Sequence, residues 1–323
     1  MSGSFVISLD FELMWGMIEK INNSSIKEKV KNVHIVIPKI LNLFRTYDIH
    51  ATWGLVGLIL FENKKELDNT INDINFNYKN SQLNVYNYVN SYKDKPFPEN
   101  LHFGLNLVKK IVSTKNQEIA SHSFSHFYSN EEGQNDKDFD KDLKLFNAIL
   151  KSKLNIETNT YIHPRFQYNK DYDEVLLDNG YKAYRGLRDD KLKDSKLSEM
   201  IKRKMKYFDR YINLLGHRSY DINNIHEEKL LNVKESYYLR PYNKKKKLLE
   251  FFKLRRVKNE MTYAAKNEKI FHLWWHPHDF GLNIDENISI LEKILKHYKY
   301  LQYKYDYRSR NMIELLSEIN TEH

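Results

Sequence analysis

Two histidines four residues apart are the first candidates for chemistry in this sequence. The stretch EIASHSFSHFY, from Glu118 to Tyr128, contains His122 and His126 with only small or apolar residues between them. If this stretch is a helical turn, both imidazoles lie on one face, because positions i and i+4 are neighbours there. Two imidazoles so placed can bind one divalent metal ion. A catalytic site of this kind would also need a carboxylate ligand, a base and an acid.

Further polar residues stand directly behind apolar and β-branched segments, where a strand would end. Asp10 and Glu12 follow such a segment in SLDFELMW, and Arg165 follows another in YIHPRF. His276 and His278 follow a third in FHLWWHPHDF. In barrels of alternating strands and helices, functional residues gather at the carboxyl ends of the strands. We therefore expect the acids, the arginine and the histidines to meet in one site.

The elements that must position these residues alternate between strand-like and helix-like patterns. Strands are predicted at residues 4–9, 50–56, 118–120, 158–162, 181–184 and 269–275. Helices are predicted at residues 26–47, 101–114, 136–154, 171–179, 191–211, 244–267, 287–297 and 309–319. Pro38 predicts a kink or a break in the first helix. Helices between successive strands imply parallel pairing, so the pattern predicts a closed or nearly closed α/β barrel.

The composition indicates a single folded unit. The chain has 323 residues, of which 41% are hydrophobic and 14% aromatic, enough for a sizeable core. No second compositional regime appears, so we expect one domain over residues 1–323. Residues 62–100 are polar, rich in Asn and Lys and weakly periodic, and we expect them to form a helical or loop insertion.

Several classes of site and location are disfavoured. The sequence has no cysteine, which excludes disulfides, thiolate metal ligands and a cysteine nucleophile. The first residues lack the basic segment and cleavage site of a signal peptide, and no apolar run approaches the roughly 18 residues of a spanning helix. We therefore expect a cytoplasmic protein. Metalloproteases of the HExxH type carry Glu directly after the first histidine, whereas Ser123 stands there, which argues against peptide hydrolysis.

An excess of basic residues favours anionic partners. Lysine and arginine number 52 against 43 acidic residues, giving a net charge of +9. The predicted basic helix at 244–258 combines a run of lysines with apolar positions. It could lie against an anionic membrane surface, or it could pack on the barrel and expose a solvated basic face. It carries no recognisable nucleic-acid module, so no nucleic-acid partner is expected.

Four segments together resemble one known family. SLDFE, EIASHSFSH, HPRF and LWWHPHDF look like the polysaccharide deacetylase family, also described by its NodB homology domain and as carbohydrate esterase family 4. The His-Ser-x-x-His motif is the most specific part. ATWGLVG, YRG at Tyr184–Gly186 and the Trp-Trp-His-Pro-His run resemble a subgroup from bacterial surface-polysaccharide gene clusters. The resemblance implies a distorted (β/α) barrel of about seven parallel strands, and removal of acetyl groups with the help of a divalent metal ion.

The resemblance also implies a metal site and a base. Asp10 matches the general base in the first motif of the family. The acid that usually follows it as a metal ligand is absent, because Phe11 stands there. Glu12 lies one place further on, and in an extended strand it points the same way as Asp10. Glu12, His122 and His126 are therefore the expected ligands, which suit Zn²⁺ and would also accept Co²⁺, Ni²⁺ or Fe²⁺.

By the same resemblance, His276 is the acid that protonates the departing amine, and Arg165 is expected to orient the base. The acid that orients the catalytic histidine stays open between Asp209 and Asp279. Substrate contacts are expected from four further residues near the strand ends: Trp53, Tyr128, Trp275 and His278.

The expected activity is metal-dependent hydrolysis that removes an N-acetyl group from an acetamido sugar, in a glycan or glycan precursor of surface polysaccharide. Because no export signal is apparent, a nucleotide-linked or lipid-linked precursor is the expected substrate. The motifs do not separate acetyl from formyl groups. A deformylase acting on a formamido sugar therefore stays open, as does a glycan-binding relative without turnover.

Overall fold

A curled sheet of parallel strands forms the centre of the protein. The computed structural model describes residues 2–72, 74–222 and 230–321. The strands are β1 (Ser4–Phe11), β2 (Ala51–Leu55), β3 (Gln117–Ser121), β4 (Thr160–Ile162), β5 (Ala183–Arg185), β6 (Leu231–Asn232), β7 (Tyr237–Tyr238), β8 (Ile270–Trp275) and β9 (Arg308–Arg310). Their order across the sheet is β6-β5-β4-β3-β2-β1-β8-β7, every pairing is parallel, and β9 pairs with β1 beside this path.

One short segment joins the two edges of the sheet. The Val233 amide donates to the Tyr184 carbonyl at 2.8 Å in β5, and the Ser236 amide donates to the His272 carbonyl at 2.9 Å in β8. The segment that contains β6 and β7 therefore bonds first to one edge and then to the other, which curls the sheet into a distorted barrel. The predicted fold class is confirmed, with eight strands along the path instead of about seven.

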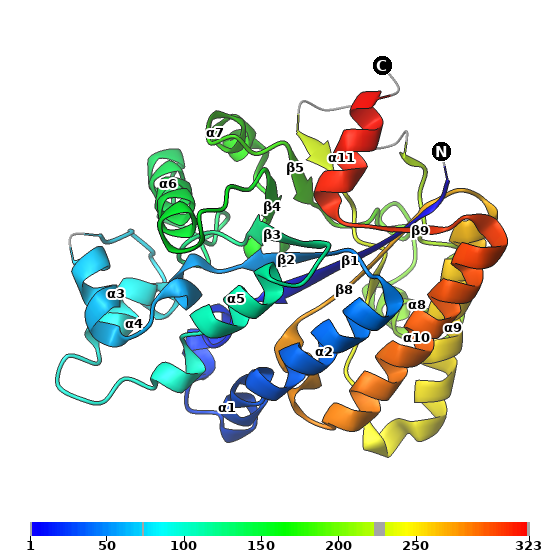
Figure 1. The fold of residues 1–323 in the computed structure, drawn as a ribbon, viewed down its shortest axis with the longest axis horizontal. Coiled ribbons are helices and arrows are strands. Elements are labelled where there is room, and N and C mark those ends of the chain that lie inside the picture. Colours follow the sequence, from blue (N-terminus) through cyan, green and yellow to red (C-terminus); the bar gives the residue numbers. More distant parts are fainter. Residues whose placement is uncertain (1, 73, 223–229, 322–323) are drawn as a thin grey trace.

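Helices cover the outer face of the sheet. They are α1 (Ser24–Lys31), α2 (Val33–Tyr47), α3 (Lys64–Ile71), α4 (Val85–Asn90), α5 (Leu105–Val112), α6 (Asp136–Leu154), α7 (Asp173–Asp178), α8 (Glu199–Phe208), α9 (Lys247–Lys266), α10 (Ile284–Tyr305) and α11 (Met312–Thr321). Figure 1 shows α5, α2 and α10 side by side across one face, with α9 against α10. All eight residues of β1 are buried, as expected of a parallel strand covered on both faces. No helix among the described residues is long and apolar enough to cross a membrane.

The first predicted helix is divided, although not at Pro38. It breaks at Asn32, which ends α1 and begins α2, and the Asn32 side chain donates to the Gly281 carbonyl at 2.8 Å. Pro38 lies inside α2, which continues through it. A tertiary hydrogen bond therefore sets the break, and the sequence pattern placed it six residues too late.

The segment 62–100 contains α3 and α4 and packs on the barrel. The rings of Tyr88 and Phe97 lie 6.3 and 6.1 Å from the ring of Trp15, which directly follows β1. Val85 and Val89 belong to the same hydrophobic core as the strands. On this packing we propose that residues 1–323 are a single domain with an insertion at 62–100.

Candidate active site

A cavity of about 250 Å³ lies where the carboxyl ends of β1, β3 and β8 meet. Asp10 and Glu12 reach it from β1, while Phe11 between them is buried elsewhere in the core, because successive side chains of a strand point to opposite faces. Its lining includes Asp10, Glu12, Gly16, His122, His126, Arg165, Phe166, Tyr238, Trp274, His276, His278 and Asp279. Asp10, Glu12, Arg165 and the four histidines predicted from the sequence therefore lie around one space.

Glu12, His122 and His126 form a buried group that fits a divalent metal ion. The Glu12 Oε2 atom lies 3.0 Å from Nε2 of His126 and 3.6 Å from Nε2 of His122. The Nδ1 atom of His122 donates to the Ile162 carbonyl at 2.8 Å, which leaves the lone pair of Nε2 directed at Glu12. One ligand atom from each residue lies within 4.8 Å of the others. One carboxylate and two imidazoles with room for further ligands are typical of a catalytic zinc site.

The space around Glu12 depends on a glycine. A Cβ atom at Gly16 would lie 2.3 Å from the carboxylate of Glu12, closer than any real contact. Burial raises the pKa of Glu12, but His276, His122 and His126 around it hold the pKa well below its usual range. The carboxylate is therefore ionised and free to act as a ligand.

The two histidine ligands do not lie on a helical turn, so that part of the prediction is wrong. Ser123 and His126 have φ values of 61° and 57°, in the left-handed region, and the segment after β3 is a loop. Asp142 of α6 holds this loop. It accepts from the Phe124 amide at 2.6 Å and the Ser125 amide at 3.0 Å, and also from the Ser125 hydroxyl.

Sequence reasoning missed Asp142. It is fully buried in α6 beside the apolar residues Phe139, Leu143 and Phe146. An unpaired carboxylate on an apolar helix face is unfavourable. An acid in that pattern therefore indicates that it has a hydrogen-bonding partner in the protein interior. The signal gives no indication of which loop the partner belongs to.

Asp10 is held by a buried arginine. The Nη1 and Nη2 atoms of Arg185 in β5 donate to the two carboxylate oxygens of Asp10 at 2.6 and 2.7 Å, a bidentate pair. The guanidinium lies over the rings of Phe166 and Trp274, at 4.7 and 4.6 Å. Burial raises the pKa of Asp10, but Arg185 outweighs burial and the net shift of the pKa is downward.

The predicted contact between Arg165 and Asp10 is wrong. Arg165 donates to Glu19 at 2.6 Å and to the Gly16 carbonyl at 3.2 Å. It has a φ of 51° in the turn that follows β4, which directs its side chain to the rim of the cavity. Arg185 instead stands within a strand. An arginine inside the strand-like segment Tyr184–Gly186 was the signal that could have identified it.

His276 faces both acids of β1. Its Nε2 atom lies 3.8 Å from Oδ2 of Asp10 and 3.8 Å from Oε1 of Glu12. Its Nδ1 atom lies 3.1 Å from Oδ2 of Asp279, which also accepts from the Tyr238 hydroxyl at 2.7 Å. Burial lowers the pKa of His276, but Glu12, Asp279 and Asp10 outweigh it and raise the pKa to about 9. His276 is therefore protonated at neutral pH.

Of the two acids considered as partners of His276, Asp279 makes the contact. Asp209 is fully buried elsewhere, where it pairs with Arg218 and accepts from the amides of Leu214 and Leu215 at 3.0 and 2.9 Å. Those contacts fix a loop beside α9, away from the cavity.

Residues 31–184 match the family profile described as Polysaccharide deacetylase. Over this range the chain is similar to polysaccharide deacetylases. The matched range includes both histidine ligands, whereas Asp10, Arg185 and His276 lie outside it and are joined to it by the geometry above. This match supports a hydrolase that deacetylates a polysaccharide, and hence a carbohydrate substrate. No curated protein matches the chain by sequence.

Solved structures support the family fold over the whole chain. A Mycobacterium smegmatis protein assigned as a polysaccharide deacetylase has a TM-score of 0.63 at 10% identity, covering 99% of this chain and 90% of that one. A Pseudomonas aeruginosa PAO1 protein with the same assignment has a TM-score of 0.58 at 10% identity, over 99% and 91%. PuuE allantoinase has a TM-score of 0.59 at 10% identity, over 99% and 91%. At this identity the likeness shows the fold alone.

Within this deacetylase fold, two of the predicted substrate contacts are wrong. Trp53 and Trp275 are fully buried. Their rings lie 6.3 and 6.5 Å from Phe44 of α2, so both side chains point out of the barrel toward the helices. Trp274, one residue earlier, points inward and lines the cavity.

The other two predicted contacts lie in or beside the deacetylase cavity. His278 lines it, with its ring stacked 4.8 Å from the ring of His276. Tyr128 is buried behind the metal group, with its ring 4.9 Å from His126 and 4.6 Å from the Arg165 guanidinium. His278 therefore remains a candidate for substrate contact, and Tyr128 supports a ligand.

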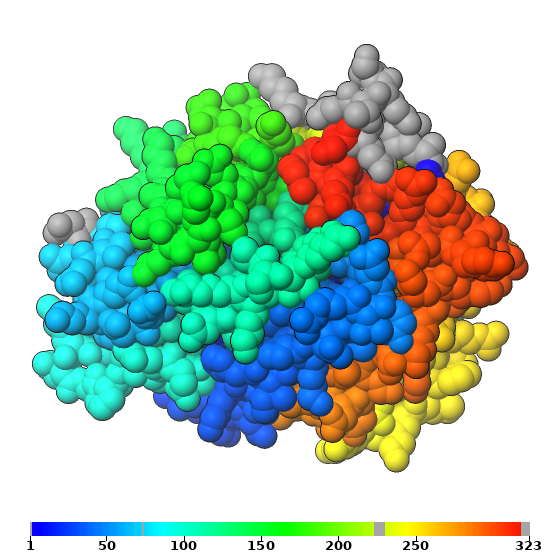
Figure 2. All heavy atoms as spheres, in the orientation of Figure 1, coloured from blue at the N-terminus to red at the C-terminus, as the bar shows by residue number. Residues whose placement is uncertain are grey.

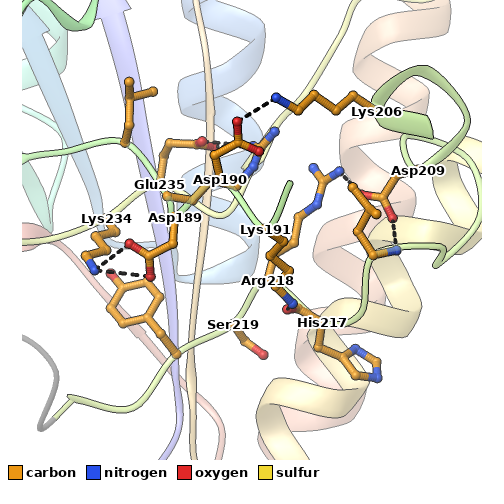
Figure 3. Close-up of a pocket in the computed structure, with 14 residues that line it drawn as sticks. Asp189, Asp190, Lys191, Lys206, Asp209, His217, Arg218, Ser219, Lys234 and Glu235 are labelled. Atoms are coloured by element: carbon orange, nitrogen blue, oxygen red, sulfur yellow. Dashed lines mark hydrogen bonds and ion pairs between the residues drawn. The ribbon is translucent and has the colours of Figure 1, made fainter. Parts of the chain in front are cut away.

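A second cavity, of about 320 Å³, lies beside β5 and β6 and is shown in Figure 3. We refer to it as the β5–β6 cavity. It is lined by the loop 187–191, by parts of 206–220, and by Lys234 and Glu235. In Figure 3, Lys206 faces Asp190 at 2.7 Å and Lys234 faces Asp189 at 3.0 Å. These two lysines are thus paired with aspartates in the wall of the same cavity.

Proposed function

We propose that the protein is a metal-dependent N-deacetylase acting on an acetamido sugar in a glycan or glycan precursor. One observation carries this proposal. A carboxylate kept ionised by Arg185 stands 3.8 Å from a histidine paired with Asp279, and both lie beside the group of Glu12, His122 and His126. An ionised base and a protonated acid at one point are what amide hydrolysis requires.

A divalent metal ion held by Glu12, His122 and His126 would polarise the acyl carbonyl and make water more acidic. Asp10 takes the proton of the attacking water, whose oxygen bonds to the acyl carbon. Arg185 fixes both oxygens of Asp10, so the base is oriented before substrate arrives. His276 gives the proton on Nε2 to the amide nitrogen as the carbon–nitrogen bond breaks. Asp279 stabilises the charged imidazole from the opposite side. The products are acetate and the free amine.

The donor set favours Zn²⁺ as the native ion. Two imidazoles and one carboxylate also suit Co²⁺, Ni²⁺ and Fe²⁺, because the ion that occupies such a site in the cell depends on metal availability as well as on ligand type.

The substrate that we propose is a nucleotide-linked or lipid-linked precursor of surface polysaccharide, deacetylated in the cytoplasm. Both carriers bring phosphate groups, which the net charge of +9 would attract. Cell fractionation with an antibody to the native protein would test the location, and recovery outside the cytoplasm would contradict it.

Metal content provides the first test. Wild type and His126→Ala, purified without a histidine tag, would be compared by elemental analysis. We expect about one divalent ion per wild-type chain and loss from the variant, because removing a ligand weakens binding strongly. Absence of metal from both, even after reconstitution with zinc or cobalt, would contradict the hydrolase.

The chemistry is then tested by product release. Acetamido and formamido sugars would be screened for acetate and formate. Asp10→Asn should lower the rate by about 10²- to 10⁴-fold while metal content stays unchanged, because it removes only the base. Formate release alone would identify a deformylase, and glycan binding without release of either acid would identify a non-catalytic relative.

A further inference from the structure

Helix α8 exposes an apolar stripe. None of its residues, all of which are described, is buried. Ile201 and Phe208, seven positions apart and therefore on one face, are 45% and 51% exposed. Leu197 and Ile212 extend the stripe at spacings of four beyond the ends of the helix, and both are exposed. An amphipathic helix normally turns such a stripe toward the core, so this one is available to a partner.

The beginning of α9 continues this surface. Leu248 and Phe251 are 70% and 60% exposed. Lys246, directly before α9, donates to the hydroxyl of Tyr207 in α8 at 3.1 Å, which places the two helices side by side. In Figure 2 the start of α9, in yellow, stands out at the lower edge of the molecule. We define the α8/α9 surface by Ile201, Phe208, Ile212, Leu248 and Phe251.

Exposed apolar side chains are concentrated in this region. Among the described residues, nine of the thirteen large apolar side chains that are exposed lie between 187 and 251. Contiguous exposed apolar area on a soluble protein is typical of an interaction site.

Basic residues flank the apolar ones. Among the described residues, Arg203, Lys204, Lys245 and Lys247 take part in no ion pair closer than 4.0 Å, and all four are exposed. Leucine, isoleucine and phenylalanine beside unpaired lysine and arginine are typical of helices that lie in the interface of an anionic bilayer. A symmetric contact with a second copy would instead bring like charges together.

In the basic helix predicted at 244–258, only the first turns expose their basic side chains. Lys253 and Arg256 are buried and pair with Glu250 and Glu260. The lysines before them are exposed, and the helix predicted at 191–211, which contains α8, supplies Ile201 and Phe208.

The beginning of α9 lies at the same end of the barrel as the catalytic cavity. Tyr238 lines that cavity, and the Arg240 guanidinium lies 4.9 Å from its ring. Lys244 follows Tyr238 by six positions and pairs with Glu286 in the first turn of α10, the next α-helix after β8. A bilayer held against the beginning of α9 would therefore lie on the side of the barrel where the cavity opens.

We propose that the α8/α9 surface docks on anionic lipid and that the substrate is a glycan carried on a membrane lipid. The lipid linkage rests on the proposed function, because only the catalytic cavity says what happens to the glycan. Docking itself is independent of that chemistry.

Co-sedimentation of the full chain with vesicles tests the docking. The probes are vesicles of phosphatidylcholine alone and vesicles that also contain phosphatidylglycerol. We expect binding only to the second, weakened by salt because exposed charges are screened. The double variant Phe208→Gln/Phe251→Gln and the quadruple variant Arg203→Gln/Lys204→Gln/Lys245→Gln/Lys247→Gln should each weaken binding by about tenfold or more. The control Ile35→Gln/Tyr303→Gln, at apolar positions on α2 and α10 that are 49% and 93% exposed, should bind as wild type does.

Two results would overturn the proposal. One is failure of the wild type to sediment with anionic vesicles at low salt. The other is a dimer that the Phe208→Gln/Phe251→Gln variant dissociates in light scattering, since the surface would then be a contact between copies. Asp10→Asn should still bind vesicles. Absence of acetate release from the wild type with retained vesicle binding would therefore count against the proposed reaction and leave the docking in place.

Discussion

The catalytic cavity and the β5–β6 cavity contain the same kinds of residue and arrange them differently. Both are lined by aspartate or glutamate, arginine and histidine. In the β5–β6 cavity Asp190 faces Lys206 and Asp189 faces Lys234, each in a single pair, and Asp209 pairs only with arginines. In the catalytic cavity several groups converge, so that Glu12 lies within 4 Å of His122, His126 and His276.

This difference indicates which cavity does chemistry. An acid that pairs only with its own cation has no other group nearby with which to react. Where several acids and histidines converge, their lone pairs and protons are available at one point. Under the proposed function, the larger cavity is therefore the structural one.

The strongest test of this comparison replaces the cation of one charge pair at each cavity. Replacing Arg185 by Gln leaves the buried Asp10 carboxylate without its partner, which should lower the free energy of unfolding by about 3–5 kcal/mol. Lys234→Gln in the β5–β6 cavity breaks the pair with Asp189, which is largely exposed. This substitution should change the free energy of unfolding by less than about 1 kcal/mol. Urea denaturation measures both, and equal effects would contradict the comparison.

The loop between the metal ligands can be tested without touching a ligand. Asp142→Asn replaces one of the two carboxylate oxygens by an NH2 donor, so either the Phe124 or the Ser125 amide loses its acceptor and His122 and His126 should lose their mutual placement. Partners behind metal ligands are typically worth about 10- to 100-fold in affinity. Competition with a zinc chelator measures this. Asp140→Asn on the exposed side of the same helix is the matched control, and an equal loss there would show that Asp142 acts only through α6.

The pH dependence of stability should reveal a histidine beneath the catalytic cavity. His272 is fully buried against the Ser8 hydroxyl at 2.8 Å, and burial lowers its pKa to about 3. Because the unfolded chain binds this proton near pH 6.5 and the folded one does not, stability falls as the pH drops below about 6.5, by about 1.4 kcal/mol per pH unit from this residue. His272→Gln should flatten the curve between pH 6 and pH 4 by that slope. Ser8→Ala loses the same hydrogen bond but keeps the histidine, so the slope should persist; a slope unchanged in His272→Gln would contradict the assignment.

The sequence predicted what depends on local pattern. The predicted bounds of six strands lie within a few residues of the observed ones, because apolar runs that end in polar residues identify buried parallel strands. The site residues at the carboxyl ends of β1, β3 and β8 were predicted from the polar residues that end those runs. The strands β6, β7 and β9 were missed, because strands of two or three residues exist only through their partners, and the helix predicted at 309–319 overlapped β9.

What failed depends on contacts between distant residues. Trp53 and Trp275 were assigned to the substrate because both faces of a parallel sheet are apolar, so the pattern does not say which face lines the barrel. Arg185 and Asp142 act on residues 175 and 17–18 positions away, respectively. Only the curl of the sheet and the packing of α6 bring them to their partners.

The smallest effect is expected at the wall of the β5–β6 cavity. Lys206 and Asp190 are each almost half exposed, so their pair is screened by solvent and should be worth less than about 1 kcal/mol in a double-mutant cycle. Lys206→Gln and Asp190→Asn should also leave acetate release unchanged, since neither contacts the converging groups. A large drop in activity with unchanged stability would mean that this cavity holds part of the substrate. The division between a structural and a catalytic cavity would then have to be abandoned.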